Sequence, residues 1–317
     1  MNSLNSEKKH HYIPVFYLKG FTNSDGCLWV YDKEGAYLFP SSPEGIAYDK
    51  NYFSFTGTEG GKVTETVENA MAALEGESAK VLKKIHNNEL LVEQERFSFA
   101  YFVASMLLRA PNFRNNIQSA TAEMIKHLNT FMASNKEKFE QTMGWYEKDT
   151  GEKVDVANED FCQWMLNPEN YSVSVDSEYA VGMALSLIEK PAMIFFNMKW
   201  MFLIAPDSFK FLTSDNPLSY LDLTIDSRTL YRGVGLTNKN IEVTLPLSKD
   251  ILAFGGWDLK EGFVKVNKQT VKDLNVRTVR ASRRIVFTNY KLQDTDMYVK
   301  KYKKKSSRDF PQKKRKK

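Results

Sequence analysis

The period of the hydrophobic pattern changes twice along the chain, and this limits the folds that the chain can form. Residues 26–39 (GCLWVYDKEGAYLF) alternate apolar and polar side chains around a DKEG turn, which predicts a β-hairpin. The middle of the chain has a helical period, and a period of two returns from about residue 199. A central helical region with antiparallel strands near both ends predicts an α+β fold rather than a regularly alternating parallel sheet.

The central region contains two long predicted helices and two shorter ones. From about Val63 to His86 the apolar residues form one stripe, and a second helix runs from Glu93 to Leu108. Pro111 interrupts that helix, which resumes over 112–143. A short helix is expected around 158–166, and another over 177–198 in which Pro191 predicts a kink. The stripe of the first helix comprises Val67, Met71, Leu74, Val81, Leu82 and Ile85.

The C-terminal part is expected to return to strands. The segment 199–215 reads as two short strands around an APDS turn, and further strands are expected at 241–246 and 250–254. A helix over 267–283 and a last strand over 284–289 complete the fold. We therefore predict a single α+β domain over 1–299, in which the polar segment 145–176 is a candidate sub-boundary.

The charge is unevenly distributed. The segment 300–317 holds eleven of the 44 Lys and Arg residues and one acidic residue, which leaves 33 basic and 38 acidic residues in 1–299. Such a segment buries too little apolar surface to fold, so we predict a disordered basic tail. Its charge density favours attraction to a polyanion such as RNA, DNA or anionic lipid, and a solubilising role is the alternative.

Several classes of protein are disfavoured. The longest apolar runs are shorter than the roughly 18 residues of a membrane span, and the first twelve residues lack the apolar core of a secretory signal. The two cysteines, Cys27 and Cys162, form no pattern, as expected in a reducing compartment. A cytoplasmic protein is therefore expected. Neither a P-loop nor a Gly-x-Ser-x-Gly elbow is present.

Two of the four histidines are adjacent, in KKHHYIPVFYLKGF (8–21). A neutral imidazole is suited to act as a general base or a metal ligand, so His10 and His11 are candidate catalytic residues. Adjacent side chains of an extended segment point in opposite directions, so only one can face a given site. The fragment HYIP is similar to a phrase of HNH nucleases, but the partners of that motif are absent. The alternative role for the pair is to brace the N-terminal segment against the core.

Three carboxylates are candidate partners of a histidine. Asp215 follows a predicted strand in TSDNP (213–217), where it is a candidate catalytic residue and metal ligand; Ser-Asp-Asn-Pro is also ordinary turn chemistry. Glu68 and Glu75 lie seven residues apart on one helix and therefore share a face. Together with a histidine these carboxylates would hold a divalent cation such as Mg or Mn. For the two glutamates, a solvated helix face is the favoured alternative.

Five arginines are candidate contacts to nucleic acid. LLRAPNFR places Arg109 and Arg114 about the interrupted helix, where they would bind phosphate or form ion pairs with the glutamate-bearing helix. The helical spacing of the C-terminal helix would place three more on one side, as a stripe that follows a phosphate backbone. These three are Arg277, Arg280 and Arg284.

The order of several phrases resembles a known family. HHYIPVFYLKGF, GCLWVYDK, VENAMAALEGES, LLRAPNFR and MKWMFLIAPDSFKFLTSDNPL together resemble the bacterial family catalogued as domain of unknown function 4238, over about residues 8–290. Val15 departs from that family, which more often has Gln there. The resemblance implies an association with anti-phage defence, without a set of catalytic residues.

The sequence thus predicts a defence effector that acts on RNA or DNA, with metal-dependent phosphodiester cleavage as the favoured activity. The alternative is a non-enzymatic sensor that binds a phage component or a structured RNA. Whether the protein is an enzyme is left open by the sequence.

Overall fold

The computed structural model describes residues 9–50, 52–53, 55, 60–153, 158–222, 224 and 235–291, so the predicted basic tail lies outside the described residues. The chain divides into two compact units. Unit 1 comprises residues 1–113 and 181–317, and unit 2 comprises residues 114–180. Helices and antiparallel strand pairs occur together, so the predicted α+β class is confirmed. The single domain over 1–299 stays a prediction.

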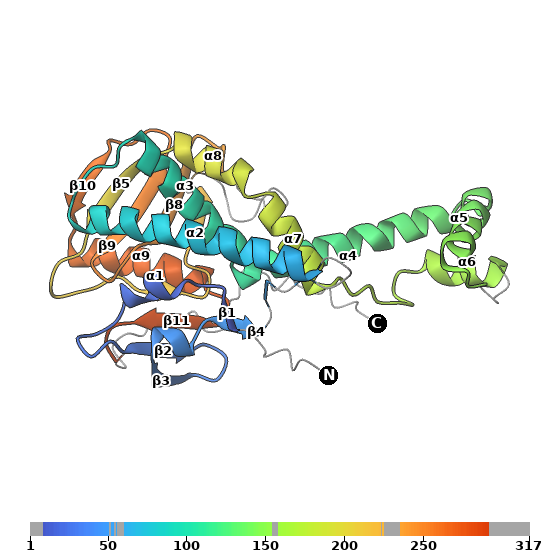
Figure 1. The fold of residues 1–317 in the computed structure, drawn as a ribbon, viewed down its shortest axis with the longest axis horizontal. Coiled ribbons are helices and arrows are strands. Elements are labelled where there is room, and N and C mark those ends of the chain that lie inside the picture. The colour runs from blue at the N-terminus through green and yellow to red at the C-terminus, as the bar shows by residue number, and fades with distance from the viewer. Residues whose placement is uncertain are drawn as a thin grey trace. The chain divides into compact units, whose positions relative to one another are not determined.

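Unit 1 is built on a five-stranded sheet that carries helices on both faces (Figure 1). Its order is β10 (Gly262–Lys265), β5 (Lys199–Ile204), β9 (Ile251–Gly256), β8 (Ile241–Pro246) and β7 (Ser219–Asp222). β10 and β5 are parallel, and the other pairs are antiparallel. Trp200 and Phe202 of β5 pack toward α3 (Glu93–Leu108) and α8 (Glu189–Asn197). Leu203, on the opposite face, packs against α9 (Lys268–Ala281).

A four-stranded antiparallel sheet joins the two ends of the sequence. Its order is β3 (Tyr37–Ser41), β2 (Leu28–Asp32), β11 (Ile285–Thr288) and β6 (Thr213–Ser214). The hairpin of β2 and β3 confirms the prediction for 26–39. Two strands do flank the APDS turn, but β5 and β6 belong to different sheets, which the sequence did not indicate.

A two-stranded ribbon carries the histidine pair. β1 (Lys9–His11) pairs with β4 (Tyr48–Lys50) in antiparallel register, with His10 opposite Asp49 and His11 opposite Tyr48. The segment between the two strands contains α1 (Val15–Lys19) and the 3-10 turn η1 (Pro43–Gly45). Neither β4 nor η1 was among the elements predicted from the sequence.

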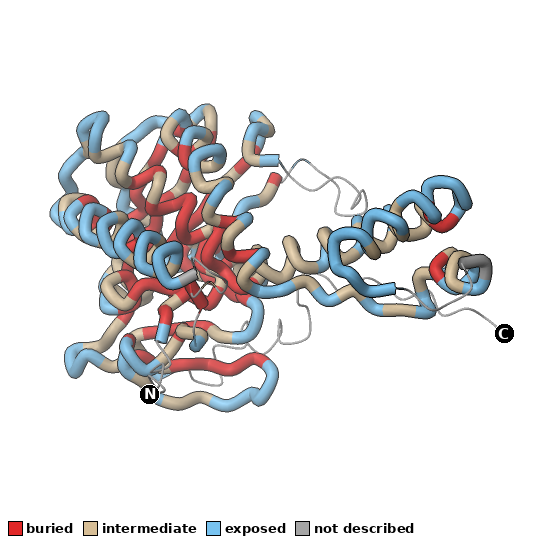
Figure 2. Tube along the Cα trace, turned by 45° about the vertical axis from the view of Figure 1, so that its right-hand side comes forward, coloured by how far each residue is buried: buried red, intermediate tan, exposed pale blue. Residues whose placement is uncertain are grey.

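The first long helix, α2 (Gly60–His86), has the predicted apolar stripe. Met71, Val81, Leu82 and Ile85 are buried in the main core, and the other two stripe residues pack against it. The buried residues of unit 1 concentrate on its strands and on the inner sides of its helices (Figure 2). α3 begins and ends where it was predicted.

Unit 2 contains most of α4 (Pro111–Ala133), α5 (Lys136–Thr150) and α6 (Asn158–Leu166). The prediction of one helix over 112–143 is wrong, because the chain leaves the helix at residues 134–135. There the Asn135 side chain accepts a hydrogen bond from the Lys138 N–H and starts α5 as its N-cap. α6 confirms the predicted short helix. Phe139 and Met165 are buried together in a small core.

The predicted helix over 177–198 is two helices, α7 (Ser177–Ser186) and α8, bent by 42°. Pro191 explains the position of the break, because it has no N–H for the Leu187 carbonyl and its ring would clash with that carbonyl. Among the described residues no single helix is long and apolar enough to cross a membrane. The bent pair of α7 and α8 has the required length and composition only when its two helices are counted together.

Candidate functional site

The histidine pair lies at one end of unit 1 in a cluster of polar residues. We call His10, His11, Glu68, Glu75 and Arg109 the histidine cluster; β1 contributes the histidines, α2 the glutamates and the C-terminal end of α3 the arginine. Because β1 is extended, its side chains alternate: His10 is buried, His11 is half-buried and Lys9 is exposed. The two histidines therefore have different surroundings.

His10 uses both ring nitrogens within the fold. The buried Phe53 N–H donates to Nδ1 at 2.9 Å, so Nδ1 carries no proton. Nε2–H then donates to the Glu68 carboxylate at 2.9 Å. This arrangement leaves neither nitrogen available for a metal ion or for proton transfer. His10 therefore attaches β1 to α2, which is the bracing role.

Arg109 joins α3 to α2 and β1. Its Nη1 donates to Glu75 at 2.7 Å, and its Nη2 donates to the backbone carbonyl of His11. The guanidinium also lies 5.4 Å from the centre of the Phe53 ring. Its side chain is only 4% exposed, so Arg109 positions His11 rather than meeting a ligand from solvent. The predicted ion pair between Arg109 and the glutamate-bearing helix is confirmed.

His11 differs from His10 in that only one of its ring nitrogens forms a hydrogen bond within the described residues. Nε2–H donates to the Glu44 carbonyl oxygen at 3.3 Å, which fixes the tautomer. Within the described part of the chain, Nδ1 has no hydrogen-bond partner. Burial lowers the pKa of His11, and the charge of Arg109 lowers it further. The Glu44 carbonyl and the carboxylates of Glu75 and Glu44 oppose this change without cancelling it. A neutral imidazole with an available nitrogen is the form that a general base requires.

Two neighbours of His11 were missed by the sequence reasoning. The His11 ring meets the edge of the Tyr48 ring, with 5.6 Å between the ring centres, and Lys9 Nζ lies 4.7 Å from the centre of the same Tyr48 ring. Lys9 could have been found from the alternation of β1, because it shares a face with His11. Tyr48 had no local signal, since it reaches His11 only through the pairing of β1 with β4.

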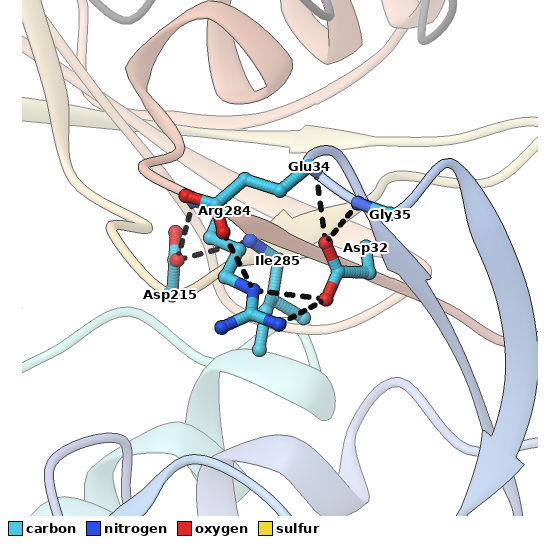
Figure 3. A network of polar contacts seen from close by, with 6 residues as sticks. All are labelled: Asp32, Glu34, Gly35, Asp215, Arg284 and Ile285. Carbon is cyan, nitrogen blue, oxygen red and sulfur yellow. Dashed lines mark hydrogen bonds and ion pairs between the residues drawn. The ribbon is translucent and has the colours of Figure 1, made fainter.

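Asp215 belongs to a different network. Its Oδ1 accepts the Arg283 N–H at 2.8 Å. Its Oδ2 accepts the N–H groups of Arg284 and Ile285 at 2.7 and 2.9 Å (Figure 3). Burial raises the pKa of the Asp215 carboxyl, while the three N–H groups and the charge of Lys33 act to lower it. The side chain therefore anchors the turn between α9 and β11, which is a structural use of a turn residue.

The same network holds the β2–β3 hairpin. Asp32 Oδ1 accepts the N–H groups of Glu34 and Gly35, and its Oδ2 accepts from the Arg284 side chain at 2.7 to 2.8 Å (Figure 3). These hydrogen bonds lower the pKa of Asp32, although burial acts to raise it. The ammonium group of Lys33 is buried and donates to the carbonyls of Val279 and Ser282, and burial lowers its pKa. These contacts lock the hairpin to the turn before β11.

The predicted arginine stripe needs one correction. α9 ends at Ala281, so Arg284 lies beyond it and does not share a helical side with Arg277 and Arg280. Arg277 is paired with Glu242 at 2.6 Å. Arg114 and Arg280 also have interaction partners. The role of these arginines in binding nucleic acid stays a prediction.

The predicted metal ligands do not come together as one set. Glu68 is held by His10 and Glu75 by Arg109, whereas Asp215 receives three backbone N–H groups. The residues that the structure describes contain no group of three His, Cys, Asp or Glu side chains suited to hold a metal ion. A Mg or Mn cofactor stays a prediction.

The chain belongs to the family described as protein of unknown function (DUF4238), whose match covers residues 9–291. The family resemblance of the sequence is thereby confirmed. No curated protein and no solved structure matches the chain.

Proposed function

We propose that this protein is an anti-phage defence effector that cleaves RNA, with His11 as the general base. The observation that carries the proposal is the His11 imidazole, which is half-buried and fixed through Nε2 to the Glu44 carbonyl, and whose Nδ1 has no hydrogen-bond partner among the described residues. Burial lowers its pKa, which favours the neutral form. The resemblance of the sequence to a defence-associated family supports the biological setting.

The reaction that a neutral imidazole can drive is attack by the ribose 2′-hydroxyl on the adjacent phosphate. His11 Nδ1 takes the hydroxyl proton while the 2′-oxygen forms a bond to phosphorus. The bond from phosphorus to the 5′-oxygen breaks, which leaves a 2′,3′-cyclic phosphate. The departing 5′-oxygen takes a proton from water, and the proton that His11 later releases neutralises the resulting hydroxide. Because the nucleophile is the 2′-hydroxyl, the substrate is RNA and not DNA.

The neighbours of His11 suit single-stranded RNA. The Tyr48 ring offers a stacking surface for a base, and the exposed Lys9 ammonium offers a positive charge for phosphate. Arg109 and Glu75 fix the backbone at His11 from the buried side. The eleven basic residues of 300–317 would add a salt-sensitive hold on the RNA backbone.

The test is cleavage of labelled single-stranded RNA, tRNA and duplex DNA by the full-length protein, with Mg, with Mn and with chelator. We expect RNA cleavage that persists in chelator and leaves cyclic phosphate ends. His11→Asn is expected to lower the rate by about 10²- to 10⁴-fold, the usual contribution of general base catalysis. The control is His127→Asn, which removes an exposed histidine of α4.

Three results would contradict the proposal. Undiminished cleavage by His11→Asn would show that His11 is not the general base. Cleavage that requires Mg or Mn would favour the metal-assisted reaction predicted from the sequence. RNA binding without cleavage, by wild type and His11→Asn alike, would favour the sensor alternative.

A further inference from the structure

A cavity of about 110 Å³ lies in unit 1 between α3, α8 and β5. Its lining is largely aromatic, and Arg96 and Glu261 supply its charged groups. Leu90, which also lines it, is 67% exposed and marks the side open to solvent. The aromatic lining residues are Phe99, Phe195, Phe196, Trp200 and Phe202.

The aromatic walls are held in place by the fold. Trp200 Nε1 donates to the Phe195 carbonyl at 2.9 Å, and the indole covers Gly255 on the neighbouring strand, where a Cβ would come within 2.7 Å of the ring. The Phe99 ring meets Trp200 at 87°, with 5.2 Å between centres. Rigid aromatic walls of this kind are suited to a planar ring, which gains contact area at little cost in side-chain ordering.

At the charged edge of the cavity, Arg96 Nη2 donates to the Met198 carbonyl at 3.2 Å, so the remaining capacity lies on Glu261 and on the second N–H of each terminal nitrogen of Arg96. Arg96 Nη1 donates to Glu261 Oε1 at 2.5 Å, and the Trp200 N–H approaches the same oxygen at 3.4 Å. Within the described residues, Glu261 Oε2 has no partner. Burial acts to raise the pKa of Glu261, but the hydrogen bond and charge of Arg96 lower it overall, so the side chain is a carboxylate at neutral pH. The cavity thus presents an anionic acceptor beside a cationic donor.

We propose that this cavity binds a purine base, and guanine in preference to adenine. The Watson–Crick edge of guanine places the O6 acceptor next to the N1–H and N2–H donors. Glu261 would accept from the two donors, and Arg96 would donate to O6. At about 110 Å³ the cavity is smaller than the roughly 150 Å³ apolar cavity that holds a benzene molecule, so only the Watson–Crick edge of the base enters it, and the rest of the nucleoside stays on the side open to solvent.

This site is separate from the histidine cluster. Arg96 and Arg109 lie thirteen residues apart along α3, which is about 20 Å at 1.5 Å per residue. The pocket therefore binds its ligand whether or not His11 acts as a base, and the two proposals are tested by different variants.

The experiment is isothermal titration calorimetry of the full-length protein with guanosine, adenosine, uridine and indole. We expect guanosine to bind most tightly, adenosine more weakly, and uridine and indole most weakly. Glu261→Gln is expected to weaken guanosine binding by about tenfold or more, because a charged acceptor is lost. The matched control is Glu242→Gln, which alters a similar ion pair to Arg277 that does not line the cavity.

Arg96→Lys is the second variant, should Glu261→Gln fail to fold. It keeps the positive charge, removes the planar guanidinium and is expected to reduce the preference for guanosine over indole. The proposal is overturned if no probe binds, if indole binds as tightly as guanosine, or if both pocket variants bind guanosine as wild type does. Loss of guanosine binding in Glu242→Gln to the same extent would also overturn it.

Discussion

Replacement of Asp215 by alanine should destabilise the fold strongly, although the residue looks like an ordinary turn residue in the sequence. The carboxylate is 3% exposed and accepts three backbone N–H groups at 2.7 to 2.9 Å. A hydrogen bond to a charged group contributes about 1.5–3 kcal/mol, and these three bonds are part-buried, so the variant should lose about 3 kcal/mol or more. That is a large fraction of the roughly 5–15 kcal/mol that stabilises a typical domain. A simple turn cap would cost only about 1 kcal/mol.

Urea unfolding followed by circular dichroism measures the effect as a shift of the midpoint at constant slope. Asp207→Ala, at a fully exposed aspartate, is the control and should change stability by less than about 0.5 kcal/mol. The stability of Asp215→Asn should lie between those of wild type and Asp215→Ala. Its side-chain oxygen still accepts the N–H groups of Arg284 and Ile285, but its NH₂ group faces the backbone N–H of Arg283. The structural role of Asp215 is refuted if the free energy of unfolding of Asp215→Ala lies within about 1 kcal/mol of the wild-type value. It is also refuted if Asp215→Asn loses RNA cleavage with unchanged stability.

Three further predictions concern the histidine cluster. Because the folded pKa of His11 lies below its ordinary value near 6.5, the unfolded chain binds the extra proton first. Stability should therefore fall as pH drops below about 6.5, and His11→Asn should lessen that fall in urea midpoints measured from pH 7.5 to 5. His10→Ala leaves the buried Phe53 N–H without its acceptor, so thermal unfolding should report a loss of about 1–3 kcal/mol; an unchanged Tm would contradict the bracing role. Arg109→Lys retains the charge, but a single ammonium group cannot donate to both Glu75 and the His11 carbonyl. Urea unfolding should therefore show a loss of about 2 kcal/mol in the free energy of unfolding. Unchanged stability would show that the planar guanidinium is dispensable.

Much of the architecture follows from local pattern. The stripe in α2, the ends of α3 and the β2–β3 hairpin were all predicted, because each depends on the spacing of apolar residues or on turn chemistry within a short segment. The errors occurred where a local signal competes with another. Asn135 as an N-cap ended the helix that the apolar pattern would have continued. The kink predicted from Pro191 is confirmed, and the break lies one turn before the proline.

The candidate site shows more clearly what cannot be predicted from local sequence pattern. The sequence identified His10, His11, Glu68, Glu75 and Arg109, and these residues do meet. It could not assign their roles, because which histidine is buried and which nitrogen is occupied depend on Phe53 and Glu44, residues 33 to 43 positions away.

What the sequence by itself determined is the fold class, the helices α2 and α3, the β2–β3 hairpin and the chemistry available to the chain. The tertiary structure decided which of those groups are already used. It placed Asp215 under three backbone N–H groups of a turn 68 to 70 residues later, and it joined Arg96 of α3 to Glu261, 165 residues away, at the edge of an aromatic cavity. Such pairings depend on the packing of elements that are distant in the chain, and hydrophobic periodicity carries no information about them, because it reports only which face of each element is buried.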